Sequence, residues 1–183
     1  MYSFLYPVKI NSRVSQLFGA RPAFYKPLGF LGHPGIDFAI PTGSEVRASN
    51  WGKVIKVGND PNGWGEYVKI DHGNFITLYA HLSSPAVSEN CFITRGQIVG
   101  WGGSTGNSTG PHLHFGILNP KQMNNGYKGY INPMILLSKT ETDNHNKLVK
   151  IEREIAQIKK DRYSKDSMYI HTTYIDRILR GEK

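Results

Sequence analysis

The sequence predicts a mainly β fold, in which an antiparallel β-sheet domain with a sandwich-like core is followed by a helical appendage. Two changes in composition near residue 137 support this division. Nineteen of the 20 glycines and all ten prolines precede that point, whereas 19 charged side chains fall in the last 46 residues. Short apolar runs between Gly, Pro and Asn are typical of strands joined by turns. We therefore expect a β domain at residues 1–137 and a charged helical tail at residues 138–183.

The β domain should contain several short strands joined by regular turns. Apolar runs predict strands at residues 36–40, 53–57, 67–71, 75–79 and 112–117. The second run should end at the loop signal of residues 58–63. The third and fourth runs flank His72, Gly73 and Asn74, a hairpin loop in which Gly73 or Asn74 can take a positive φ. Such a series points to a sandwich-like or barrel-like core.

The tail carries its own apolar pattern. Leu148, Ile151, Ile155 and Ile158 follow one another at spacings of three, four and three residues. This spacing places them on one face of a helix. The helix could dock on the β domain, or it could mediate self-association or contact with another surface.

Charge and hydropathy limit the classes of partner. The formal net charge is +8 and the pI is about 9.5, so the surface favours anionic partners such as nucleic acid, anionic lipid or acidic polymers. Residues 1–137 hold only 11 Lys and Arg, with no basic cluster beside an aromatic platform, and we expect no nucleic-acid partner. No apolar run is long enough to predict a transmembrane segment. Residues 1–7 do not resemble a secretory signal.

Two histidines share one face of a predicted strand. His112 and His114 lie two residues apart, and side chains at this spacing point the same way in a strand. Burying two imidazoles without partners is costly, and a metal or a catalytic role would remove that cost. His-x-His is a common pattern, however, and does not identify a site by itself.

A third histidine and a carboxylate lie near the start of the domain. His33 and Asp37 are four residues apart, but Pro34 and Gly35 argue against a helix and favour a loop that leads into the strand at 36–40. Two imidazoles and one carboxylate form a known catalytic zinc set with an open fourth position. The same ligand types also form the facial triad of non-haem iron sites, so residue chemistry alone leaves both metals open.

Three motifs in order resemble the lysostaphin-type zinc metallopeptidases, which are peptidoglycan endopeptidases. The motifs are GHPGID at residues 32–37, YAHL at 79–82 and TGPHLHF at 109–115. The likeness covers about residues 5–135. It implies an antiparallel β fold with the site in an open groove walled by loops. Residues 18–27, which would form part of one wall, depart from the usual lead-in of the family.

The resemblance also implies a role for each site residue. One Zn²⁺ per chain would be held by His33, Asp37 and His114, while His81 and His112 would be catalytic residues away from the metal. The implied reaction is hydrolysis of peptide cross-links or stem peptides in bacterial peptidoglycan. Zinc would polarise the scissile carbonyl and lower the pKa of its bound water to about 7. His81 or His112 would accept the proton, because the ordinary pKa of imidazole is about 6.5.

Two further expectations concern the biological role. A non-catalytic relative that binds the cell wall or an activator partner is the alternative, but such proteins usually lose ligands and all five site residues are present here. The small catalytic domain, the basic charge and the lack of a visible signal favour a phage setting, in which the bacteriolytic enzyme acts at the wall from the virion or as an endolysin released by lysis. His72 should be a structural turn residue. The single cysteine, Cys91, should be a small buried hydrophobe.

Overall fold

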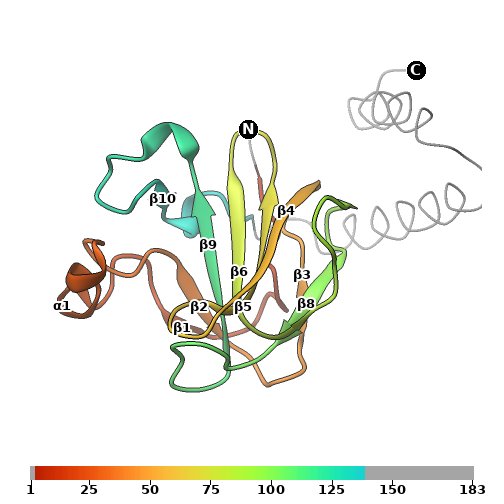
Figure 1. The fold of residues 1–183 in the computed structure, drawn as a ribbon, viewed down its shortest axis with the longest axis horizontal. Helices are drawn as coiled ribbons and strands as arrows, with labels where there is room; N and C mark the ends of the chain where they lie inside the picture. The colour runs from red at the N-terminus through yellow and green to blue at the C-terminus, as the bar shows by residue number, and fades with distance from the viewer. Residues whose placement is uncertain (1–2, 139–183) are drawn as a thin grey trace, which may run out of the picture. The chain divides into compact units, whose positions relative to one another are not determined.

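An antiparallel sheet of ten strands runs through residues 3–138, the part of the chain that the computed structural model describes (Figure 1). The strands are β1 (Val14–Gln16), β2 (Ile36–Ala39), β3 (Glu45–Arg47), β4 (Gly52–Asp60), β5 (Gly65–Asp71), β6 (Ile76–Pro85), β7 (Phe92–Ile93), β8 (Ile98–Gly102), β9 (His112–Leu118) and β10 (Tyr130–Ile131). The helical segments are short: α1 (Pro22–Tyr25), η1 (Lys26–Leu28), η2 (Pro120–Gln122) and η3 (Pro133–Ile135). The mainly β, antiparallel prediction is confirmed.

Strand β6 organises the sheet. The main path runs β1-β2-β9-β6-β5-β4-β7, with β10 added to β9. The first half of β6 pairs with β9, whereas its last residues pair with β8, which in turn pairs with β3. Figure 1 shows β9 and β6 side by side in the middle of the sheet. The change of partner falls just after Ala80, so the chain at residue 81 lies where β6 leaves one neighbour for another.

All five strands predicted from apolar runs are present, and two of them, β4 and β6, extend well beyond their predicted ends, β6 as far as Pro85. β4 continues to Asp60, through residues that the sequence assigned to a loop, because Gly58, Asn59 and Asp60 pair with β5 across the hairpin. Gly58 fits there because its missing Cβ leaves room for the Tyr67 ring; a Cβ would lie 2.8 Å from the ring carbon Cζ. Sheet pairing therefore outweighs local turn preference. Gly73 takes the expected positive φ in the next hairpin.

The two faces of the sheet carry different side chains. One face forms the main core, in which Leu113, Phe115 and Ile117 of β9 are fully buried. The opposite face carries a smaller apolar cluster built on Leu78, Ala80 and Tyr130 and covered by aromatic residues from loops. We call this opposite face the second face. Because side chains alternate along a strand, the even-numbered residues of β9, which include both histidines, belong to the second face.

The described chain stays attached to the β domain up to its end. The Phe4 N–H donates to the carbonyl of Leu136, the Ser138 N–H donates to the carbonyl of Phe4, and Leu137 packs against the main core. The predicted helical tail lies beyond Ser138, outside the described residues, and the division at residue 137 stays a prediction. Within residues 3–138, no helix combines the length and apolar character needed to cross a membrane.

Two expectations about single residues have different outcomes. Cys91 is exposed rather than buried, because it lies at the turn before the short edge strand β7. His72 is a structural residue in the loop between β5 and β6, as expected, and its side chain is buried. Its Nδ1 lies 2.6 Å from the carbonyl oxygen of Trp51, and its Nε2 lies 2.8 Å from Oγ1 of Thr77.

Candidate metal centre

The pairing of β2 with β9 brings the predicted ligands together. Asp37 and His114 are directly opposite each other in the antiparallel register, so their side chains share the second face. His33 lies in the loop that leads into β2, as predicted. Gly35 permits its approach, because a Cβ there would lie 2.6 Å from the Phe115 carbonyl oxygen and 2.7 Å from His114 Cε1. The glycine of the His-Pro-Gly segment is therefore required by close packing.

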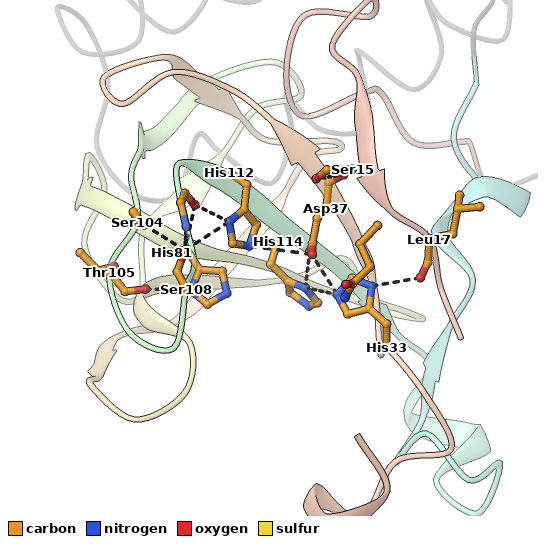
Figure 2. Close-up of polar contacts among 12 residues, drawn as sticks. Ser15, Leu17, His33, Asp37, His81, Ser104, Thr105, Ser108, His112 and His114 are labelled. Carbon is orange, nitrogen blue, oxygen red and sulfur yellow. Dashed lines mark hydrogen bonds and ion pairs between the residues drawn. The ribbon is translucent and has the colours of Figure 1, made fainter. Parts of the chain in front are cut away.

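Three ligand atoms converge at this place. His33 Nε2 lies 2.9 Å from His114 Nδ1, His114 Nδ1 lies 2.9 Å from Asp37 Oδ1, and His33 Nε2 lies 3.1 Å from the same oxygen. Figure 2 shows the three side chains turned toward one another. All three residues are buried. Residues 81 positions apart in the chain are thus placed around one small volume.

The protonation of these groups leaves lone pairs directed at that volume. His33 donates from Nδ1 to the Leu17 carbonyl oxygen at 3.1 Å, so its Nε2 is the unprotonated nitrogen. Burial alone would raise the pKa of Asp37, but the adjoining rings of His114 and His33 outweigh this effect and hold the pKa well below its ordinary value. Burial lowers the pKa of His114 to about 4. At neutral pH Asp37 is therefore a carboxylate and His114 a neutral imidazole.

This donor set fits zinc. Two imidazole nitrogens and one carboxylate oxygen are common ligands of catalytic zinc, with bonds of about 2.0–2.1 Å. Atoms at tetrahedral angles on such bonds lie about 3.3 Å apart, only a few tenths of an ångström beyond the separations found here. The Nε2 atom of His114 is buried and has no hydrogen-bond partner within residues 3–138. Coordination of a metal through Nδ1 would hold the His114 ring in place without a hydrogen bond to its Nε2.

The two predicted catalytic histidines lie beside the ligands. The rings of His81 and His112 are 4.6 Å apart, and His112 Nε2 lies 3.9 Å from Asp37 Oδ2. Each ring donates from Nδ1 to a backbone carbonyl at 2.8 Å, His81 to that of Thr105 (Figure 2) and His112 to that of Gly110. Both Nε2 atoms are therefore the unprotonated nitrogens. Burial lowers the pKa of His81, which favours its neutral form.

His81 has an unusual backbone. Its φ is +61°, a conformation that non-glycine residues rarely adopt and that is often found at functional sites. The His81 N–H donates to the Trp64 carbonyl oxygen at 2.8 Å, which helps to fix this conformation. It occurs where β6 changes partner from β9 to β8. The sequence motif identifies His81 but gives no sign of this bend.

Two aromatic residues beside the ligands were not predicted from the sequence. The Trp64 ring lies against His114, with centroids 4.7 Å apart, and the Tyr25 ring lies 5.3 Å from that of His33. The Tyr25 hydroxyl accepts a hydrogen bond from Gln16 Nε2 at 2.9 Å. Tyr25 belongs to the segment that departs from the family pattern, and Trp64 follows a loop signal. The sequence offered no periodic pattern that would have placed either one at the site.

Comparison with known proteins agrees with the three motifs. The sequence profile described as Peptidase family M23 matches residues 31–133, which is more than half of the chain and includes all five predicted site residues. The chain belongs to peptidase family M23. It is 40% identical over 114 residues to the peptidoglycan DD-endopeptidase ShyA of Vibrio cholerae serotype O1, an alignment that covers 62% of this chain and 26% of that protein.

Solved structures similar in sequence have the same fold. A zinc-containing peptidase from Vibrio cholerae superposes with a TM-score of 0.60 at 33% identity, covering 72% of this chain and 39% of that one. A point variant of the catalytic domain of the prophage-encoded M23 protein EnpA from Enterococcus faecalis has a TM-score of 0.59 at 30% identity, covering 75% of this chain and 98% of that one. This M23 chain spans about a quarter of the length of the first curated relatives that it matches.

Proposed function

We propose that the chain is a zinc-dependent endopeptidase that hydrolyses peptide cross-links or stem peptides of bacterial peptidoglycan. The observation that carries the proposal is the convergence of three ligand atoms within about 3 Å of one another, beside two imidazoles whose Nε2 atoms are free to accept protons. The similarity to ShyA, named as a peptidoglycan DD-endopeptidase, supports the choice of substrate.

The five site residues would have two kinds of role, metal binding and proton transfer. His33, Asp37 and His114 would hold the zinc, which when bound polarises the scissile carbonyl and makes an attacking water more acidic. His112 and His81 would accept the proton of that water at Nε2 and return it to the leaving amine. Their Nδ1 hydrogen bonds to the carbonyls of Gly110 and Thr105 fix the tautomer that this role requires. Positioned general acid–base groups of this kind typically contribute about 10²–10⁴-fold to rate.

Purified peptidoglycan provides the direct test. The chain should release muropeptides with new amino termini, a chelator should stop the release, and added zinc should restore it. Mass spectrometry of the products from walls with direct cross-links and from walls with glycine-rich bridges would identify the bond that is cut. Full activity in a sample verified as metal-free would refute the proposal. A zinc-loaded chain that binds walls but releases nothing would instead support the non-catalytic alternative.

We also propose a phage setting for this activity. The support is the similarity to the prophage-encoded EnpA catalytic domain and the net charge of +8, which suits an acidic wall polymer. The purified chain, added from outside to cells with an accessible wall, should lyse them, and this lysis should weaken as salt concentration rises because exposed charges are screened. Activity on isolated walls without lysis of any cells would argue against this setting.

A further inference from the structure

Lys69, which forms no ion pair within residues 3–138, lies on the same face of the sheet as the proposed metal ligands. Lys69 of β5 is directly opposite Leu78 of β6, and Leu78 is opposite Gly116 of β9. His114 of β9 is opposite Ala80 in the adjacent row. Lys69 therefore lies two strands away from His114 across the sheet and two residues away along the strand direction, on the same face. The spacing of strands and residues in a sheet puts their Cα atoms about 12 Å apart.

The surroundings of Lys69 do not satisfy its charge. The side chain is partly buried and its Nζ lies 5.7 Å from the centroid of the Tyr67 ring. Within residues 3–138 no carboxylate forms an ion pair with it, and burial lowers its pKa with no acidic group acting in the other direction. Lys56, which is opposite Lys69 on β4, does have a partner, since its Nζ lies 3.0 Å from Glu89 Oε1. Burying a cation without a partner is costly, so this lysine is suited to an anion supplied from outside.

We propose that Lys69 is a specificity-determining residue that binds a free carboxylate of the peptide substrate. This inference rests on the proposed peptidase function. An extended peptide advances roughly 3.3 Å per residue. A substrate that runs from the metal centre over the rings covering Leu78 and Ala80 would therefore present a group to Lys69 a few residues from the scissile bond. The adjacent Tyr67 ring belongs to the apolar cluster of that face. It would exclude water from one side of the ion pair and strengthen the pair.

Matched peptides test this role. Two cross-linked peptides would be compared that differ only in carrying side-chain carboxylates or the corresponding carboxamides. Wild type should prefer the acid form in kcat/KM by about tenfold or more, the scale of a hydrogen bond to a charged group. Lys69→Met keeps most of the buried stem and removes the charge, and its preference should fall to about one. Lys69→Arg should retain a preference, and Lys69→Glu should reverse it.

A second lysine provides the control. Lys53 of β4 is exposed and lies opposite Asp71, one strand and one row of the sheet farther from the metal centre than Lys69. Lys53→Met therefore removes the same charge and should leave the preference unchanged. Thermal unfolding of each variant checks that it is folded. An acid-to-amide ratio near one in wild type, or an unchanged ratio in Lys69→Met, would overturn the role of Lys69.

Binding separates this inference from the proposed function. The affinity of both peptides would be measured by calorimetry with the slow variant His112→Ala, alone and combined with Lys69→Met. If His112→Ala binds the acid form more tightly and the double variant does not, the role of Lys69 is supported. This holds even if wild type hydrolyses neither peptide, a result that would refute only the peptidase proposal. Equal binding of the two peptides would overturn the role of Lys69.

Discussion

Replacing Gly35 by alanine should disable the metal centre without touching any ligand. The added Cβ would lie 2.6 Å from the Phe115 carbonyl oxygen, 2.7 Å from His114 Cε1 and 2.8 Å from His114 Nε2. Ordinary carbon contacts are about 3.5–4.0 Å, so the overlap is close to 1 Å. Phe115 lies in the middle of the sheet and cannot move easily. The strain must therefore displace the His114 ring or the loop that carries His33.

Two magnitudes follow from this overlap. Inserting a methyl group into a well-packed place typically costs about 1–3 kcal/mol of stability. Disturbing groups that orient metal ligands typically lowers metal affinity by about 10–100-fold. We therefore expect Gly35→Ala to fold, to unfold at a lower temperature, and to bind zinc about 10–100-fold more weakly. Hydrolysis should return in part at high zinc concentration, because the ligands themselves are intact.

A matched variant makes the assay specific. Gly110→Ala lies in the loop before β9, where an added Cβ would have no atom within 4 Å, and it should bind zinc as wild type does. Zinc affinity would be measured by competition with a chromophoric chelator, alongside thermal unfolding of the zinc-free proteins. Wild-type zinc affinity in Gly35→Ala would show that the loop relaxes freely. In that case the packing argument for this glycine would be wrong.

Three other predictions follow from the site and its surroundings. His114→Ala should lose zinc in metal analysis, whereas His112→Ala should keep zinc and lose about 10²–10⁴-fold in turnover; equal zinc loss in both would contradict the assignment of ligand and base. Burial lowers the pKa of His72 below its ordinary 6.5, so its contribution to stability is complete above about pH 6.5 and declines below it, as the unfolded state takes up a proton that the folded state resists. Below that pH, the free energy of unfolding measured by chemical denaturation should fall more steeply with decreasing pH in zinc-free wild type than in zinc-free His72→Gln, by up to about 1.4 kcal/mol per pH unit. Parallel curves of unfolding free energy against pH would contradict this. A chain that ends at Ser138 should bind zinc and cut a small soluble cross-linked peptide, at a temperature where it is shown to be folded, because no site residue is removed; a folded, zinc-loaded but inactive fragment would place part of the tail in the site.

Much of the fold could be predicted because its signals are local. Strands such as those at residues 67–71 and 112–117 follow from short apolar runs bounded by turn residues, and the face shared by His112 and His114 follows from alternation. The length of β4 could not be predicted in this way. Its last three residues have turn-forming side chains and stay in the sheet only because β5 supplies their hydrogen bonds. Local preference and pairing disagree there, and pairing depends on residues farther along the chain.

The candidate ligands could be found from local sequence patterns, but their placement around one site could not. Each half of the ligand set was visible as a weak local pattern, but nothing in residues 33–37 alone indicates that Asp37 will be opposite His114. The three motifs overcame this limit because their order along the chain identifies a family, and the family implies the pairing. Trp64 and Tyr25 carry no such motif, so only the folded chain places their rings against His114 and His33.

The alternation of side chains also explains why chemistry and substrate selection can share one surface. On β9 the odd-numbered residues fill the main core, which leaves the even-numbered His112 and His114, the proposed base and the proposed metal ligand, on the second face. On β6 and β5 the same alternation puts Ala80, Leu78 and Lys69 on that face. A substrate that lies over the rings covering Ala80 and Leu78 would reach the metal centre in one row and Lys69 in the next. Under the two proposals, the chemical step would depend on ligands fixed by the β2–β9 pairing and the choice of peptide on β5, so variants at Lys69 should change selectivity without disturbing zinc.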